Sequence, residues 1–392
     1  MGHIICHYSE IGLKGKNRRF FEEKLVKNIK KALPKNSWQE VRRISGRILV
    51  ELKKEVDKKK IKENLKNVFG LAFFSFALSC EQKIETIKKK AVEILKGEEF
   101  KTFKIETQRS KKDFPLNSQE ISEQVGEYVL KKLALHRKGG SGARVDLKNP
   151  DITCFIEIVE KYAFLYLEKI KGPGGLPVSV SGKAISLLSG GIDSPVASFY
   201  GMKRGIKVIF LHFTSYPFTR QASVEKAKKI VKVLNKFQFQ SKLYLVPFTD
   251  IQKQILTKTQ AKLRVILYRR FMFRIAEEIA KKEKARALIT GESVGQVASQ
   301  TLENISAIEQ AVKLPVLRPL IGMDKQDIIK KAKEIGTFGI SILPAQDCCQ
   351  RFLPKHPETK AKLKEVKEEE RKLDIEKLIK EALAKIKAEI II

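Results

Sequence analysis

The chain has 392 residues, of which 43% are hydrophobic, so it is long enough to fold into two or three domains of ordinary size. Lys and Arg number 78 against 45 Asp and Glu, a formal net charge of +33 that favours a polyanionic partner such as nucleic acid. No apolar run approaches the roughly 20 residues of a membrane span, and no signal peptide opens the chain, which argues against a membrane partner and predicts a cytoplasmic protein.

The N-terminal segment predicts a small α/β domain over residues 1–58. An apolar strand in "HIICHY" leads through the glycine-punctuated basic loop "EIGLKGKN" into an amphipathic helix, and "GRILVEL" at 46–52 predicts a second strand. Residues 59–170 alternate helices and strands and predict a second α/β domain without a nucleophile–base motif.

Basic loops mark this second domain as a candidate RNA-binding region. The stretches "RSKKDFP" at 109–115 and "HRKGGSGAR" at 136–144 cluster Lys and Arg beside glycines, which let backbone approach phosphates closely. Residues 1–180 hold 38 basic and 23 acidic residues, a net charge of +15, so both halves of the chain are basic.

The stretch "KGPGGLPVSVSGK" at 171–183 predicts a linker, because its glycines and prolines cannot extend either neighbouring element. Beyond it, residues 184–392 predict alternating apolar strands and helices, the pattern of a doubly wound parallel sheet. The Lys/Glu-rich residues 358–392 predict a solvated helical ending.

The most informative stretch, "SLLSGGIDSPVASFY" at 186–200, places a glycine loop between a strand and a helix. In a doubly wound sheet, ligands bind beyond the carboxyl ends of the strands, so this loop is the default site. Gly190 and Gly191 allow a tight turn with bare backbone N–H groups, and the helix that begins near Ser194 adds its positive end. The loop predicts an anion site that is neither a Walker loop nor a dinucleotide fingerprint.

The sequence "SGGIDS" resembles the PP-loop of ATP pyrophosphatases, which cleave ATP between the α and β phosphates. Further stretches narrow the resemblance to the tRNA 4-thiouridine synthetases, also called tRNA sulfurtransferases, over nearly the whole chain. These stretches are "EIGLKGKNRRFF", "GPGGLPV", "YRRFMFRIA", "GESVGQVASQT", "LRPLIGMDKQDII" and "DCCQRFLPKHP".

The resemblance implies an N-terminal ferredoxin-like domain, a THUMP RNA-binding domain and a PP-loop catalytic domain at 184–392. It implies that the enzyme uses ATP to activate O4 of uridine 8 in tRNA and replaces that oxygen with sulfur. It also implies an ATP pocket that comprises Leu187, Leu188, Ser189, Gly190, Gly191, Ser194, His212, Phe213, Arg269, Gly291 and Gln300.

Two charged residues complete the implied activation site. Asp193 stands where many phosphate loops carry a lysine, and its carboxylate suits the Mg²⁺ that accompanies ATP. Lys325 matches a family position implicated in activation, where an ammonium offsets charge that grows on the phosphates. No Cys/His spacing predicts a protein-bound metal site.

For sulfur delivery, the family uses a cysteine persulfide that a cysteine desulfurase loads, and Cys348 falls on the family's catalytic cysteine position. We expect the short form of the family, without the rhodanese domain of some members and without a C-x-x-C pair. Cys349 then acts either as a resolving thiol or as a bystander. Cys6, Cys80 and Cys154 lie in apolar strands and are expected to be buried.

Other functions fit parts of this pattern. A different PP-loop ligase that modifies tRNA with an amine would need no reactive cysteine, and a tRNA-binding protein that had lost its chemistry would need neither cysteine nor loop. The sequence also leaves open a homodimer and a second role in passing sulfur to the thiamine-pathway carrier protein.

Overall fold

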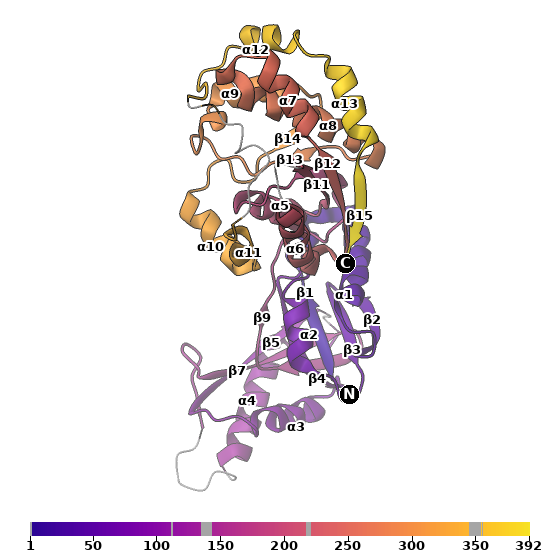
Figure 1. Ribbon diagram of the computed structural model, residues 1–392. Coiled ribbons are helices and arrows are strands. Elements are labelled where there is room, and N and C mark those ends of the chain that lie inside the picture. The colour runs from indigo at the N-terminus through magenta and orange to yellow at the C-terminus, as the bar shows by residue number, and fades with distance from the viewer. Residues whose placement is uncertain (1, 111–112, 135–142, 217–220, 345–353, 355) are drawn as a thin grey trace. The chain divides into compact units, whose positions relative to one another are not determined.

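The computed structural model describes residues 2–110, 113–134, 143–216, 221–344, 354 and 356–392, and the chain divides into two compact units, Met1–Pro177 and Val178–Ile392 (Figure 1). The division falls inside the stretch 171–183 that the sequence predicts as a linker. In the described part of the chain, no helix combines the length and the apolar character that a membrane crossing requires.

The first unit is built on one mixed sheet with the strand order β2-β3-β1-β4-β8-β7-β5-β6, and β9 pairs with β4. Its strands are β1 (His3–His7), β2 (Trp38–Ile44), β3 (Arg47–Leu52), β4 (Phe73–Glu81), β5 (Thr102–Arg109), β6 (Arg144–Val145), β7 (Ile152–Val159), β8 (Tyr162–Tyr166) and β9 (Ile170–Lys171). Its helices are η1 (Glu10–Asn17), α1 (Arg18–Ala32), α2 (Lys58–Leu65), α3 (Ile84–Leu95) and α4 (Ser118–Ala134).

Strand β4 joins two hydrophobic clusters of this unit, because its first half pairs with β1 and its second half pairs with β8. One cluster packs α1 and α2 on β1, β3 and β4, and the other packs α3 and α4 on β5, β7 and β8. Ile61 and Leu65 of α2 belong to the first cluster, although the sequence places its domain boundary before them, at residue 58. The fully buried Cys6 and Cys154 and the buried Cys80 confirm the expectation for these three thiols.

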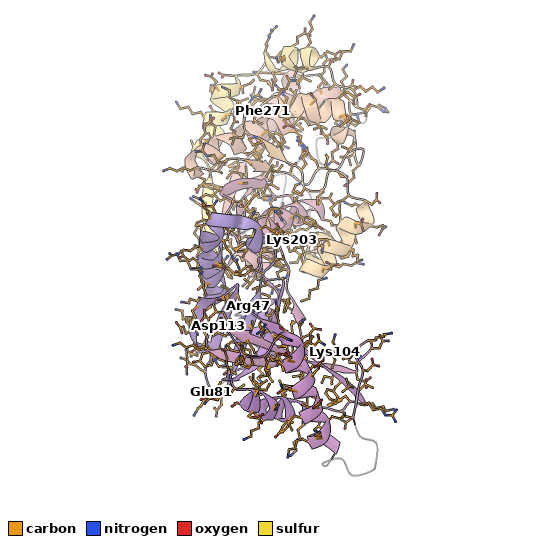
Figure 2. All side chains as sticks on the ribbon, turned by 180° about the vertical axis from the view of Figure 1, so that it is seen from behind. Arg47, Glu81, Lys104, Asp113, Lys203 and Phe271 are labelled. Atoms are coloured by element: carbon orange, nitrogen blue, oxygen red, sulfur yellow. The ribbon has the colours of Figure 1, made fainter. Side chains whose placement is uncertain are left out.

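A buried carboxylate, Glu157 of β7, holds side chains from three other strands. It forms an ion pair with Arg47 of β3, its Oε1 lies 2.9 Å from Nε2 of His7 of β1, and it accepts a hydrogen bond from the Tyr166 hydroxyl at 2.5 Å. Arg47, labelled in Figure 2, is only 4% exposed. Burial by itself raises the pKa of Glu157, but His7 and Arg47 outweigh burial and lower it to about 2.

We therefore expect Glu157→Gln to lower the free energy of unfolding by about 3 kcal/mol, because it leaves the buried Arg47 without its carboxylate. The folded pKa of about 2 lies below the ordinary value of 4.5, so this stabilisation is full above pH 4.5 and is lost as the pH falls towards 2. Urea unfolding curves measured at several pH values should show the wild type and the variant converging in that window. The exposed Glu81, which pairs with the exposed Lys83, supplies a control, since Glu81→Gln should change stability by less than about 0.5 kcal/mol.

The second unit is an α/β domain on a six-stranded sheet with the order β14-β13-β10-β11-β12-β15. Its strands are β10 (Lys183–Leu187), β11 (Lys207–Thr214), β12 (Ser241–Pro247), β13 (Leu288–Ile289), β14 (Val316–Leu317) and β15 (Lys387–Ile391). Its helices are α5 (Asp193–Lys203), α6 (Gln221–Gln238), α7 (Thr249–Lys258), η2 (Ala261–Leu263), α8 (Arg264–Glu283), η3 (Ala298–Gln300), α9 (Leu302–Glu309), α10 (Lys325–Ile335), α11 (Phe338–Ser341), α12 (Leu363–Glu370) and α13 (Ile375–Ala384).

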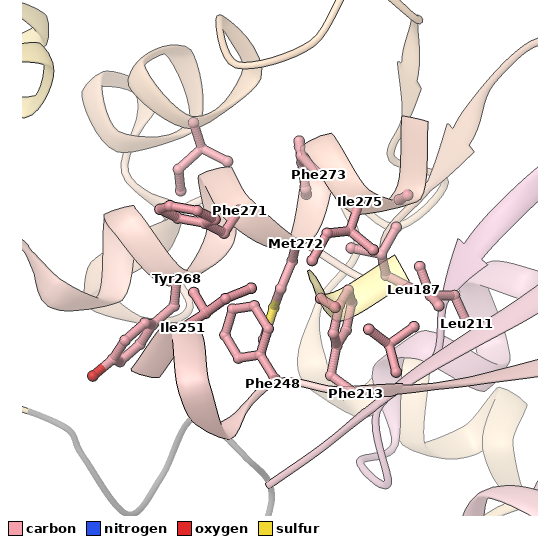
Figure 3. Packing of buried hydrophobic residues seen from close by; sticks show 14 of the residues in the cluster. Leu187, Leu211, Phe213, Phe248, Ile251, Tyr268, Phe271, Met272, Phe273 and Ile275 are labelled. Atoms are coloured by element: carbon pink, nitrogen blue, oxygen red, sulfur yellow. The ribbon is translucent and has the colours of Figure 1, made fainter. Parts of the chain in front are cut away.

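Both faces of this sheet are covered, as the doubly wound pattern predicts. Strands β10 to β14 pair in parallel, and alternate residues of β10 serve opposite faces. Ile185 and Leu187 belong to one core cluster with residues of α8. Figure 3 shows Leu187 with Phe271, Met272 and Ile275 of that helix. Ser186 points the other way, where its hydroxyl hydrogen-bonds Ser198 of α5 at 2.8 Å.

The C-terminal region departs from the solvated helical ending that the sequence predicts. Residues 387–391 form β15, which pairs antiparallel with β12 at the edge of the sheet, and Val366 of α12 is buried against α8. Glu370 of α12 is 5% exposed and forms ion pairs with Arg270 at 2.8 Å and Arg274 at 2.5 Å. The prediction was wrong here because the charges that suggested solvent are partly satisfied by partners on α8.

Candidate active site

The glycine loop joins β10 to α5 and is held in shape by its own serines. Ser194 Oγ accepts a hydrogen bond from the backbone N–H of Ser189 at 2.9 Å, and Ser189 Oγ accepts one from the N–H of Gly191 at 3.2 Å. The loop lies at the N-terminus of α5, where the helix dipole favours negative charge. This arrangement suits an oxyanion such as a phosphate.

Gly291, which follows β13, packs directly against the start of α5. A Cβ at this position would lie 2.7 Å from the backbone nitrogen of Ser194 and 2.8 Å from the carbonyl carbon of Asp193. No larger residue fits without moving the loop, which explains why a glycine stands here. The close approach brings the segment 291–300 beside the glycine loop.

Asp193, the first residue of α5, is bound by two side chains from distant segments. Lys325 Nζ, at the start of α10, donates to Oδ1 at 2.5 Å, and Gln296 Nε2 donates to Oδ2 at 2.9 Å. The Asp193 side chain is 22% exposed and that of Lys325 is 42% exposed, so both are within reach of a ligand. The structure therefore places a carboxylate, an ammonium and an amide together beside the loop.

Glu292 organises the arginines of the site. Its carboxylate is 1% exposed, pairs with Arg269 at 2.5 Å and with Arg318 at 2.8 Å, and accepts a hydrogen bond from Thr290 at 2.9 Å. Burial by itself raises the pKa of Glu292, but the two guanidinium groups outweigh burial and lower it. Glu292 thus stays ionised and fixes the position of Arg269.

Gln300 stabilises the turn at residues 293–300 through contacts with its backbone. Its side-chain oxygen lies 3.4 Å from the N–H of Ser293, and its carbonyl accepts a hydrogen bond from the N–H of Gly295 at 2.9 Å. Gly295 has φ +76°, a conformation that favours glycine. Gln300 therefore closes the turn 293–300 from which Gln296 reaches Asp193.

The residues predicted to border the adenosine are mostly buried. Leu187 and Phe213 belong to the core beneath the loop (Figure 3), and Leu188 is 2% exposed. His212 Nδ1 lies 2.9 Å from the Leu188 carbonyl, and its Nε2 lies 3.1 Å from Ser223 Oγ. Because a carbonyl only accepts, Nδ1 carries the proton, and His212 fixes the backbone that leads into the loop.

Several residues of the site carry no signal that the sequence alone reveals. Glu292 and Gln296 lie inside the stretch "GESVGQVASQT", but their partners come from α8, α5 and the segment after β14.

Cys348 and Cys349 lie outside the described residues, as do parts of the basic loops at 111–112 and 135–142. Among the residues that the structure describes, no group of three or more His, Cys, Asp or Glu could hold a metal ion.

Comparison with known proteins gives three family matches in chain order. The ThiI ferredoxin-like domain matches residues 3–75, the THUMP domain matches residues 81–168, and the family "Thiamine biosynthesis protein (ThiI)" matches residues 179–375. The second match covers the α/β region with the basic loops, and the third covers the glycine loop, Gly291 and Lys325.

Curated relatives and a solved structure match nearly the whole chain. A "Probable tRNA sulfurtransferase" of Caldanaerobacter subterraneus subsp. tengcongensis is 48% identical over 96% of both chains, and one of Moorella thermoacetica is 43% identical over 97% of this chain and 95% of its own. The crystal structure of a 4-thiouridine synthetase–RNA complex with bound ATP is 38% identical, with a TM-score of 0.89 and full coverage of both chains.

Proposed function

This chain belongs to the ThiI family of tRNA sulfurtransferases, and from that premise we propose that it is an ATP-dependent enzyme that converts uridine 8 of tRNA to 4-thiouridine. The observation that carries the proposal is the glycine loop with Asp193 and Lys325 beside it, in a fold shared with a 4-thiouridine synthetase that binds RNA and ATP. The cytoplasm, where tRNA and ATP are both present, is the compartment we propose.

ATP would bind with its phosphates over the loop 189–192, where backbone N–H groups and the start of α5 favour negative charge. Arg269, Gly291 and Gln300 shape the neighbouring wall, and the buried Leu187, Leu188 and Phe213 would contribute mainly through backbone. Mg²⁺ fits this site as a companion of the phosphates, because it keeps waters and phosphate oxygens as ligands and needs only one or two carboxylates. Asp193 is the carboxylate that would meet it.

The Asp193–Lys325 ion pair supplies the charges for activation. With phosphates bound over the loop, the Lys325 ammonium would exchange the Asp193 carboxylate for a phosphate oxygen, and Asp193 would then be available to hold a metal ion that accompanies them. O4 of the uridine then attacks the α-phosphorus, and pyrophosphate leaves. Lys325 offsets the negative charge that develops on the phosphates in this step.

Sulfur delivery is a separate step that we assign to Cys348. A cysteine desulfurase transfers sulfur to this thiol, and the resulting persulfide attacks C4 of the activated uridine with loss of AMP. A second thiol, from Cys349 or from an external reductant, then breaks the remaining S–S bond and releases 4-thiouridine. Transfer of sulfur to a thiamine-pathway carrier, and a homodimer, stay predictions.

One experiment tests the proposed function directly. Unmodified tRNA is incubated with the protein, ATP, Mg²⁺, a cysteine desulfurase and cysteine, and 4-thiouridine is followed by its near-ultraviolet absorbance and by nucleoside mass spectrometry. We expect sulfur at uridine 8 with pyrophosphate and AMP as products. A product that carries an amine would instead support another PP-loop ligase, and no ATP-dependent product would support a binding protein without chemistry.

We expect residues 1–180 to carry much of the tRNA affinity, because they combine a net charge of +15 with the region matched by the THUMP domain. Binding of the whole chain and of fragments 1–180 and 181–392 is measured by fluorescence anisotropy at several salt concentrations. The affinity of the whole chain and of 1–180 should fall steeply between about 50 and 200 mM salt. If the fragment 181–392 alone binds tRNA as tightly as the whole chain, the prediction that residues 1–180 carry much of the affinity is wrong.

A further inference from the structure

Lys226 of α6 is a buried lysine beside the glycine loop. It is 7% exposed, and its ammonium donates hydrogen bonds to the backbone carbonyls of Ser341 at 2.8 Å and Leu343 at 2.7 Å. Burying an ammonium is costly unless it is well hydrogen-bonded, and these two bonds to neutral carbonyls offset part of that cost. A lysine in this place therefore ties α6 firmly to the end of α11.

The same side chain lines the glycine loop. A Cβ on Gly190 would lie 3.3 Å from Lys226 Cδ and 3.6 Å from its Nζ. A second contact joins the same two segments, because Ser341 Oγ donates to the carbonyl of Gly191 at 3.2 Å. The loop and the residues 341–343 are thus linked both by a positive charge and by a direct hydrogen bond.

The residues that Lys226 binds lie close to Cys348 in the sequence, because Leu343 precedes Cys348 by five residues. Lys226 holds the carbonyls of Ser341 and Leu343 close to the glycine loop, where phosphates would bind. These two residues precede Cys348 along the chain. The ammonium of Lys226 lies between the loop and these residues, so phosphates at the loop act on it through their charge.

We propose that Lys226 is a positioning residue that couples occupancy of the glycine loop by phosphates to the placement of residues 341–343, which precede Cys348 in the sequence. Bound phosphates draw the ammonium towards the loop, and the carbonyls of 341 and 343 follow it. The inference rests on the proposed function for the role of Cys348, but the coupling itself is a property of the loop and the segment.

The first test compares activation with delivery in Lys226→Met, which keeps the length of the side chain and removes its charge and donors. We expect the amount of pyrophosphate released per 4-thiouridine formed to rise about tenfold, because misplaced delivery leaves the activated uridine to hydrolyse. Ser341→Ala should raise the same ratio by a smaller factor. A variant that is merely less stable loses both products together, so an unchanged ratio in both variants overturns the proposal.

The second test needs no sulfur transfer. In a Cys349→Ser background, the rate at which iodoacetamide modifies Cys348 is measured by mass spectrometry with and without α,β-methylene ATP and Mg²⁺. We expect the nucleotide to change this rate about fivefold or more with Lys226 and not with Lys226→Met. Lys229→Met, which alters an exposed lysine of the same helix, should behave like Lys226 in both tests.

The outcomes separate the two proposals. If the parent protein thiolates tRNA but the nucleotide leaves the alkylation of Cys348 unchanged, the coupling is wrong and the proposed function stands. If tRNA is not thiolated while the nucleotide effect on Cys348 disappears in Lys226→Met, the proposed function fails and the coupling is supported.

Discussion

Asp193→Ala is expected to slow pyrophosphate release by about a hundredfold or more, because it removes the carboxylate that we propose to meet the metal ion and the phosphates, and it releases Lys325 and Gln296 from their shared partner. The variant should keep its fold, since the Asp193 side chain is polar and 22% exposed, and it should keep its affinity for tRNA. Pyrophosphate release is measured with saturating tRNA and with ATP varied, so that a change in KM is separated from a change in kcat.

A matched control for this variant is Asp250→Ala. Asp250 of α7 also pairs with one lysine, Lys385 at the end of α13, at 2.9 Å, but both side chains are 57% exposed. Its removal should leave the rate within about twofold of the wild type, as expected for a surface ion pair. A near-normal rate of pyrophosphate release in Asp193→Ala would show that the role proposed for this carboxylate is wrong.

Cys348→Ser is expected to lose thiolation from a desulfurase and cysteine almost completely while it still releases pyrophosphate. In the proposed mechanism, activation uses the glycine loop, a metal ion and the uridine oxygen, none of which needs a thiol, whereas delivery needs a persulfide at the activated carbon. The variant should bind ATP and tRNA like the wild type. Free sulfide, a nucleophile that bypasses the carrier, should partly restore 4-thiouridine, and this rescue separates lost delivery from lost activation.

Cys349→Ser is the natural control for this experiment. It should be milder under reducing conditions, where an external thiol replaces any resolving thiol. If Cys349→Ser is the inactive variant and Cys348→Ser thiolates at the wild-type rate, the carrier is the other member of the pair. If both variants are active, sulfur reaches the uridine by a route that the sequence does not show.

Local patterns in the sequence were sufficient to predict the parallel strands of the second unit and the position of its glycine loop, although not its C-terminal region. Apolar strands alternating with helices predict a parallel sheet because each crossover must cover one face, and β10, β11 and β12 are buried as that pattern requires. The glycines of the loop follow from the tight turn after β10, and the burial of Cys6, Cys80 and Cys154 follows from their apolar strands. These features depend on neighbours within a few residues of each other.

The partners of the charged groups were decided only by the tertiary structure. Gln296 meets Asp193 and Lys226 meets Ser341 across gaps of 103 and 115 residues, and no periodicity in a lysine-rich chain distinguishes these side chains from the many exposed ones. The edge strand β15 was not predicted, because its residues are mostly exposed and show no buried apolar face. Backbone pairing with β12 places it in the sheet. Side-chain pairing over such distances arises from packing, which brings together groups that the sequence keeps apart.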